Sequence, residues 1–264
     1  MNVYESLRHY WDEDAATYNF TPEHFPHTKA QEAAWRAALT TYLPPPPARV
    51  LDVGAGTGSL SLLLAHLGYQ VTALDLSPKM LEHLRLRAAD EGLDIQIVEG
   101  RADSPPQLAF DAVVERLLLW TLPHPEATVR AWRRVAAGGC LVCFEGIWGA
   151  DDKVEALRGR GRRYLHRLLR RPPEHHDSYD PSTADQLPFS HGMSPNSIVE
   201  VVEAAGWRSV RLERLRNVEW ARAMMLPPLE RMLGVTPEFA VVARDSGVGV
   251  PPSGKSTEPA GRIP

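Results

Sequence analysis

Two glycine-rich stretches of the sequence have spacings that could bind the phosphates or the sugar of a nucleotide. One of them, "GVPPSGKST" at residues 249–257, satisfies the phosphate-loop pattern G-x-x-x-x-G-K-[ST]. A phosphate loop needs its own backbone N–H groups and a following helix whose N-terminus faces the phosphates. Pro251 and Pro252 remove two of those donors, and the seven remaining residues contain two prolines and a glycine, which excludes a helix. We interpret the match as chance, within a disordered Gly/Pro/Ser-rich tail at residues 246–264.

The other stretch, "VLDVGAGTG", lies between an apolar strand pattern and a helix pattern. Its glycines follow G-x-G-x-G spacing, which lets the backbone pass close to a ligand (Gly54, Gly56, Gly58). Asp75 ends the next predicted strand, seventeen residues beyond Gly58, where its carboxylate can accept hydrogen bonds from both hydroxyls of a ribose. This pairing predicts a nucleoside cofactor. Ser59 stands where the dinucleotide pattern G-x-G-x-x-G has its third glycine, which counts against NAD(P) without excluding it.

The elements that must position these residues alternate between strand and helix from residue 48 to residue 149. Apolar strands separated by helices indicate a mostly parallel sheet covered on both faces, an α/β doubly wound fold. The strands are predicted at 48–54, 69–76, 94–100, 110–120 and 140–148, with helices at 59–68, 77–92 and 125–139. Later in the chain, a helix at 194–207 precedes strands at 209–215 and 237–245, which are expected to pair as an antiparallel edge.

The flanking segments have other patterns. Residues 1–43 contain two amphipathic helix patterns, at 3–18 and 27–43, before the core at 48–149. Residues 150–193 break the alternation with an arginine-rich helix and a loop rich in His, Asp, Pro and Ser. We interpret this segment as a small helical and loop cap, and residues 194–245 as the C-terminal part of the sheet.

Length and composition limit the class of protein. The chain has 264 residues, 44% of them apolar and 23% charged, with a formal net charge of −4. Such a length suits one substantial domain. The charge gives no overall attraction to nucleic acid or anionic membranes, no apolar run approaches the roughly 20 residues that span a bilayer, and the N-terminus lacks a signal-peptide pattern. We expect a cytoplasmic protein with no nucleic-acid or membrane partner, and leave a homodimer open.

The two cysteines, Cys140 and Cys143, form a C-x-x-C sequence within a predicted strand. Residues three apart on a strand point to opposite faces, so these thiols cannot pair there. Zinc sites of this type usually need a second Cys pair, which the sequence lacks, and the adjacent His175 and His176 would seldom both bind one ion. We therefore expect two core thiols and no metal.

In these motifs the chain resembles the class I S-adenosylmethionine-dependent methyltransferases, in their small-molecule, UbiE/UbiG-like branch. The resemblance rests on Asp52 two residues ahead of Gly54, on "LDLSPKML" at the second strand and on "VEG" ending the third, and it covers most of residues 1–245. It implies a seven-stranded Rossmann-like sheet, N-terminal lid helices and one methyltransferase domain over residues 1–245. It also implies S-adenosyl-L-methionine as the cofactor.

The resemblance also assigns the cofactor-binding residues. Asp75 would hold the ribose, Tyr18 would close over the cofactor from the lid, and residues 115–116 would lie beside the methionine amino group. In one departure, Arg101 stands where the family often has an Asp that accepts from the adenine amino group. Arginine cannot accept, so we expect Asp103 or a backbone carbonyl to substitute. The expected set is Tyr18, Asp52, Gly54, Gly56, Gly58, Asp75, Leu76, Met80, Ala102, Asp103, Glu115 and Arg116.

Methyl transfer mainly requires that a nucleophile be held in line with the methyl group while water is excluded, and a general base helps if the nucleophile is protonated. Candidate catalytic residues are His24, His27 and Glu145, although an exposed loop histidine is more often only solvated and Glu145 could merely end its strand. Candidate acceptor-binding residues are Trp11, Trp120, Trp148, His175, His176 and Tyr179.

The resulting hypothesis is in-line methyl transfer to an O, N or C atom of a small molecule, in particular a bacterial secondary metabolite. Two alternatives stay open. One is an NAD(P)-dependent oxidoreductase on the same type of fold, and the other is a non-catalytic cofactor-binding protein.

Overall fold

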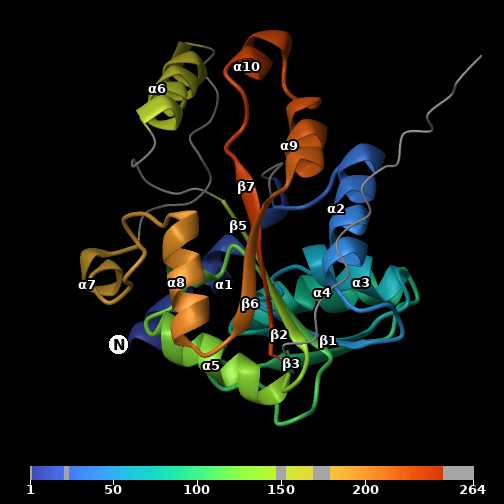
Figure 1. The fold of residues 1–264 in the computed structure, drawn as a ribbon. Helices are drawn as coiled ribbons and strands as arrows, with labels where there is room; N and C mark the ends of the chain where they lie inside the picture. The colour runs from blue at the N-terminus through green and yellow to red at the C-terminus, as the bar shows by residue number, and fades with distance from the viewer. Residues whose placement is uncertain (1, 21–23, 147–152, 169–178, 246–264) are drawn as a thin grey trace, which may run out of the picture.

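A computed structural model describes residues 2–20, 24–146, 153–168 and 179–245. Its centre is one seven-stranded sheet in the order β3-β2-β1-β4-β5-β7-β6 (Figure 1). The first five strands are parallel, whereas β7 runs antiparallel to both β5 and β6. The strands are β1 (Arg49–Val53), β2 (Gln70–Asp75), β3 (Ile95–Glu99), β4 (Ala112–Arg116), β5 (Cys140–Gly146), β6 (Arg208–Arg214) and β7 (Glu238–Arg244).

This architecture confirms the predicted doubly wound, mostly parallel sheet and the antiparallel pairing of the last two strands. The order of the last two strands was not predicted: β7 lies between β5 and β6, so β6 is the edge strand. The insertion has a simple physical reason. β7 is apolar and buried along its middle, so it takes the interior position, whereas the polar and mostly exposed β6 becomes the edge strand.

Helices cover both faces of the sheet (Figure 1). Side chains of α2, α3 and α9 pack on one face, and those of α5 and α8 pack on the other, while α4 packs beside α3 on β2 and β3. The helices are α1 (Val3–Asp14), α2 (Lys29–Tyr42), α3 (Ser59–His66), α4 (Pro78–Asp90), α5 (Pro125–Val135), α6 (Lys153–Leu168), α7 (Pro181–Ala184), α8 (Pro195–Ala204), α9 (Arg216–Ala223) and α10 (Pro228–Met232), with short 3-10 turns η1 (Tyr18–Phe20) and η2 (Leu119–Thr121).

The two cysteines of β5 lie on opposite faces of the sheet, as their spacing of three residues on one strand predicts. Cys140 is buried against the α2/α3 face, and Cys143 is buried in the cluster on the α5/α8 face. Both thiols are free. The prediction of two core thiols on opposite faces is therefore confirmed.

Local signals fix most helix ends. Ser77 and Ser194 accept hydrogen bonds from backbone N–H groups three residues on, and each is followed by proline at the first helical position. The first helix is shorter than predicted, because it ends at Asp14 and Tyr18 begins the separate turn η1. That break lets the Tyr18 ring approach the carboxyl end of the sheet.

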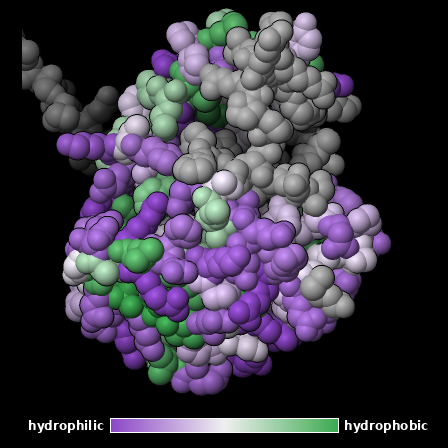
Figure 2. All heavy atoms as spheres, turned by 180° about the vertical axis from the view of Figure 1, so that it is seen from behind, coloured by the Kyte–Doolittle hydropathy of each residue, from purple (hydrophilic) through white to green (hydrophobic). Residues whose placement is uncertain are grey.

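Of the predicted cap, the structure describes α6, α7 and the approach to α8. Helices α6 and α10 lie beyond the carboxyl ends of the strands, at the top of Figure 1, where Arg162 of α6 donates to the carbonyls of Leu233 and Gly234. The proposed tail at 246–264, with the phosphate-loop-like sequence, lies outside the described residues. No described helix is long and apolar enough to cross a bilayer. Figure 2 shows the back of the molecule, where hydrophilic side chains dominate and apolar ones gather in a smaller patch.

Trp132 of α5 joins the helical layer to the loop after β3, and its substitution tests this packing. The side chain is fully buried, and its Nε1 donates to the carbonyl of Ala102 at 2.8 Å. Trp132→Ala is expected to lower the free energy of unfolding by about 3–5 kcal/mol, because it leaves a cavity and an unpaired carbonyl. Trp132→Phe, which keeps most of the ring, should cost clearly less. Denaturant unfolding measures both, and equal costs for the two variants would contradict the packing role.

Candidate functional site

The glycine loop after β1 has a backbone shape that glycine favours. Gly54, Gly56 and Gly58 have φ of +68°, +54° and +93°, values that side chains with a Cβ rarely adopt. A Cβ on Gly58 would lie 2.4 Å from Leu84, and one on Gly54 would lie 2.8 Å from Leu118. A Cβ on Gly56 would instead stand 4.0 Å from the Tyr18 ring, within space bordered by the pocket. The loop thus brings bare backbone to the carboxyl edge of the sheet.

Asp75 ties this loop to the end of β2. Its carboxylate accepts the N–H of Gly56 and the N–H of Ser77, both at 2.8 Å, and the side chain borders the pocket. Burial raises the pKa of Asp75 to about 6, although the two backbone N–H groups favour the charged form. At neutral pH the pocket therefore presents an ionised carboxylate with capacity for further donors.

Asp52 was expected to bind the cofactor, but the structure places it beneath the loop. The side chain is only 2% exposed, does not line the pocket, and accepts from Ser61 Oγ at 2.5 Å in the first turn of α3. Burial raises its pKa to about 7, against the hydrogen bond from Ser61. Asp52 therefore holds the start of α3, and with it the loop, in position.

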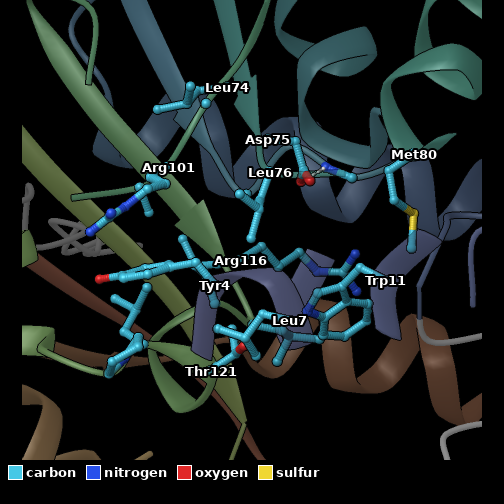
Figure 3. A pocket seen from close by; sticks show the side chains of 18 of the residues that line it. Tyr4, Leu7, Trp11, Leu74, Asp75, Leu76, Met80, Arg101, Arg116 and Thr121 are labelled. Atoms are coloured by element: carbon cyan, nitrogen blue, oxygen red, sulfur yellow. Dashed lines mark hydrogen bonds between the residues drawn. The ribbon is translucent and has the colours of Figure 1, made fainter. Parts of the chain in front are cut away.

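The pocket itself encloses about 730 Å³, part of it open to solvent. Glycine-loop backbone, the end of β2, the segment after β3 and the segment after β4 form its floor and sides, and α1 closes it (Figure 3). The expected cofactor residues that line it are Tyr18, Gly54, Gly56, Asp75, Leu76, Met80, Ala102 and Arg116. Those that do not are Asp52, Gly58, Asp103 and Glu115.

Helix α1 supplies two lining residues that sequence reasoning missed. Tyr4 and Leu7 join the predicted Trp11 along one side of the helix and point into the pocket (Figure 3). Their spacing of three and four residues is the signal that could have found them, because it places side chains on one helical face. The lid therefore covers the pocket with apolar and aromatic side chains.

The segment after β4 forms another wall, and two buried carboxyls hold its backbone. Leu117 adopts a left-handed φ of 57°, rare for a residue with a branched side chain. Directly after it, the N–H of Leu118 donates to Glu115 at 3.0 Å and that of Leu119 to Glu145 at 2.9 Å. Glu115 and Glu145 thus act beneath the pocket wall, rather than beside the cofactor or the acceptor as expected.

Both of these carboxyls also have a raised pKa. Glu115 Oε1 and Glu145 Oε2 are buried and accept from no backbone N–H group, and the Cys143 thiol lies beside Glu115. A proton retained on Glu115 lets it donate to Glu145. Burial raises the pKa of Glu145 to about 8, and burial together with the neighbouring charge raises that of Glu115 well above its usual range. The pair is therefore largely protonated at neutral pH.

The predicted catalytic histidines lie outside the pocket lining. His24 is buried behind Tyr18, with the two rings stacked at 4.1 Å and His24 Nδ1 at 2.8 Å from the Tyr18 carbonyl oxygen. His27 is exposed, and its backbone N–H donates to Gln31 at the start of α2. The structure thus gives His24 a supporting position behind a lining residue, and places His27 at the surface.

Of the expected acceptor-binding residues, the structure brings three aromatic side chains together. Trp120 lies 6.0 Å from Trp11 and 5.3 Å from Tyr179 between ring centroids. The Tyr179 hydroxyl is 2.9 Å from that of Thr121, which lines the pocket. Trp120 and Tyr179 therefore back the lid residue Trp11. The other expected residues, Trp148, His175 and His176, lie outside the described residues.

Comparisons with known proteins agree with this geometry. Residues 50–139 match the methyltransferase-domain family. A ubiquinone biosynthesis O-methyltransferase of Xanthomonas campestris pv. campestris is 37% identical over 139 residues, 51% of this chain and 57% of that protein. One from Xanthomonas axonopodis pv. citri is 36% identical over 147 residues, 53% of this chain and 60% of that protein. The chain thus spans somewhat over half the length of these curated relatives.

Solved structures share the fold at low identity. An N-methyltransferase of Haemonchus contortus, in complex with phosphomonomethylethanolamine and S-adenosylhomocysteine, has a TM-score of 0.61 and 15% identity, covering 92% of this chain and 60% of that one. A putative sarcosine dimethylglycine methyltransferase from Galdieria sulphuraria has a TM-score of 0.56 and 14% identity, covering 89% and 99%. The [4+2]-cyclase SpnF has a TM-score of 0.55 and 18% identity, covering 81% and 80%.

The sheet order, the glycine loop and the domain match together indicate an α/β domain of the methyltransferase type. Residues 50–139 thus match a methyltransferase domain, and the chain is similar over about half its length to ubiquinone biosynthesis O-methyltransferases.

The Glu115–Glu145 pair predicts a specific dependence of stability on pH. The folded pKa of Glu145, about 8, exceeds its ordinary value of 4.5, so the stabilisation is complete below pH 4.5 and is lost as the pH rises through 8. One such group contributes a slope that approaches about 1.4 kcal/mol per pH unit between the two values. Glu145→Gln mimics the protonated form, and is expected to flatten this decline.

Denaturant unfolding of the wild type and Glu145→Gln from pH 5.5 to 8.5 measures the effect. Glu126→Gln, on the exposed side of α5, is the matched control and should leave the pH dependence unchanged. Parallel pH curves for the wild type and Glu145→Gln would show that Glu145 ionises normally in the folded protein.

Proposed function

We propose that this protein transfers a methyl group from S-adenosylmethionine to a small-molecule acceptor. The observation that carries the proposal is the partly buried Asp75 carboxylate, which holds the Gly56 N–H and faces a pocket closed by aromatic side chains of α1. A sugar with two adjacent hydroxyls suits such an acceptor, and bare glycine backbone admits a bulky ligand beside it.

The lining residues suit each part of this cofactor: the ribose, the base and the methionine part. We assign the ribose to Asp75, and the base to the apolar stretch formed by Leu76 and Met80. The Arg116 side chain extends towards Trp11 in Figure 3, and its guanidinium donates to Ser59 Oγ at 2.8 Å and to the His24 carbonyl at 2.9 Å. A guanidinium attracts a carboxylate and repels an ammonium, so we place Arg116 beside the carboxylate of the methionine part instead of its amino group.

S-adenosylmethionine, when bound, supplies a methyl group already activated by a positively charged sulfur. The protein then has to orient the acceptor, exclude water and leave the acceptor's proton a route out. The aromatic and apolar walls from α1 and from residues 117–123 serve the first two tasks. We propose a compact, partly apolar metabolite as acceptor, with a secondary metabolite as the leading candidate.

Among the described histidines, His24 stacks on the ring of the lining residue Tyr18. Its Nδ1 faces a carbonyl oxygen and therefore carries the proton in the neutral ring, which leaves Nε2 as the basic nitrogen. Because His24 does not line the pocket, we assign it the support of the Tyr18 ring. Burial raises the pKa of Tyr18 to about 12, so its hydroxyl stays protonated and can donate at neutral pH.

The alternatives have less support. An NAD(P)-dependent oxidoreductase would use the same edge of the sheet, but the matched domain family and the curated relatives are methyltransferases. The cyclase among the structural neighbours shows that this fold also carries other chemistry. A protein that binds the cofactor without methylating anything would show binding but no turnover with any acceptor.

Titration calorimetry with S-adenosylhomocysteine tests the cofactor assignment. The wild type is expected to bind, and Asp75→Asn to bind at least about 30-fold more weakly, because a charged acceptor shared by two hydroxyls is lost (about 2 kcal/mol or more). Glu99→Gln is the matched control, since Glu99 ends the neighbouring strand in register with Asp75 but does not line the pocket.

Equal affinities for the wild type and Asp75→Asn would contradict the assignment of the ribose. Stabilisation of the wild type by NAD(H) but not by S-adenosylhomocysteine would favour the oxidoreductase. Turnover is then measured as S-adenosylhomocysteine release with a panel of phenols, amines and acidic carbon compounds.

A further inference from the structure

At the base end of the pocket, three side chains form a closed polar cluster. Asp103 accepts from Arg101 Nε at 2.9 Å and from Arg101 Nη2 at 2.5 Å, and it also accepts from the Tyr4 hydroxyl at 2.7 Å. The Arg101 guanidinium lies over the Tyr4 ring, 3.5 Å from the centroid. Arg101 and Asp103 belong to the loop after β3, whereas Tyr4 belongs to the first turn of α1. The cluster therefore joins the lid to the body of the domain.

Both oxygens of Asp103 are engaged in this cluster. Burial acts to raise the pKa of Asp103, but the hydrogen bonds from Arg101 and Tyr4 outweigh it and the pKa is lowered. The carboxylate is thus ionised and held by a two-pronged guanidinium contact and a hydroxyl, an arrangement stronger than one neutral hydrogen bond. Asp103 also does not line the pocket. Three of the roughly four acceptor positions of the carboxylate are thus occupied, which leaves an adenine amino group one position at most.

Other polar contacts along α1 differ in strength. Arg8 Nη2 lies 3.2 Å from Glu99, but both side chains are nearly half exposed, so this ion pair contributes little. Asp12 accepts from Ser77 Oγ at 2.6 Å at the start of α4. Tyr4 and Asp12 therefore fix the two ends of the helix, on either side of the pocket-facing Leu7 and Trp11.

We propose that Asp103, oriented by Arg101, is a latch that holds Tyr4 and thereby α1 closed over the cofactor pocket, and that Asp103 does not recognise the amino group of the base. The part that concerns the base rests on the proposed function, whereas the latch is a property of the cofactor-free protein. Arg101 contributes by holding the Asp103 carboxylate through two hydrogen bonds beside the Tyr4 hydroxyl.

Hydrogen exchange of the cofactor-free protein tests the latch. Tyr4→Phe removes only the hydroxyl, and Asp103→Ala removes the carboxylate. In both variants, amides of α1 between Leu7 and Trp11 should exchange about tenfold faster than in the wild type, because closure loses a charge-assisted hydrogen bond. Glu99→Gln is the matched control, because it removes the exposed ion pair between β3 and Arg8 of the same helix, and it should change exchange less than twofold. Wild-type exchange in both Tyr4→Phe and Asp103→Ala would overturn the latch.

Calorimetry separates the latch from recognition of the base. Two ligands are compared, S-adenosylhomocysteine and its analogue with purine in place of adenine, which lacks only the amino group. Asp103→Ala should weaken both by the same factor, within about twofold, because a residue that does not touch the amino group shows no coupling to it. If Asp103→Ala weakens S-adenosylhomocysteine and leaves the analogue unchanged, Asp103 reads the base and the proposal is wrong.

The outcomes also distinguish this proposal from the proposed function. If the wild type binds neither ligand, the assignment of the cofactor fails, while the exchange rates in α1 still decide whether the latch exists. If the wild type binds both ligands but α1 exchanges alike in all variants, the cofactor assignment stands and the latch is overturned.

Discussion

The hydrogen bond from the Gly56 N–H to the Asp75 carboxylate is the constraint on which the site depends. It joins the turn that follows β1 to the end of β2, and it requires the parallel register that sets Val53 beside Leu74. The Leu74 carbonyl accepts from both Gly54 and Ala55, which fixes the same turn from the other side. A loop held in this way presents backbone and a carboxylate to one ligand without a large reorganisation on binding.

Buried carboxyl groups recur at this edge of the sheet in different roles. Asp75 faces the pocket, Asp52 supports α3, and the Glu115–Glu145 pair supports the backbone that follows β4. Burial raises the pKa of each of these carboxyl groups, so ionising any of them lowers the stability of the folded protein. The left-handed Leu117 adds strain to the same region. The carboxyl edge of the sheet is thus less stable than it would be with apolar side chains in place of these acids, and the same acids hold the pocket in its shape.

Sequence patterns predicted the features that depend on local rules. The glycine spacing, the acid at the end of β2 and the strand periodicity that separates Cys140 from Cys143 were all readable, because steric freedom and side-chain alternation are set by neighbouring residues. The lid was predicted in outline, but not the contribution of Tyr4. That residue meets Asp103 across 99 positions of sequence, and no local pattern announces such a contact.

Tertiary packing explains the remaining differences. The insertion of β7 between β5 and β6 follows from which strand is more apolar in the assembled sheet. The sequence predicts Glu145 as an exposed acid at a strand end, but the side chain is buried, where the Leu119 N–H and Glu115 are its partners. The catalytic roles predicted for His24 and His27 have a related difficulty. Both residues are close to the lid helix in sequence, but His24 lies behind Tyr18 and His27 lies at the surface, so neither lines the pocket.

A crystal structure of the full chain with S-adenosylhomocysteine would test the central claim most directly. We predict that the ribose hydroxyls lie within hydrogen-bond distance of the Asp75 carboxylate, that the amino-acid end points to Arg116, and that α1 covers the nucleoside. A nucleoside bound elsewhere on the protein, or in this pocket with its sugar turned away from Asp75, would contradict the account.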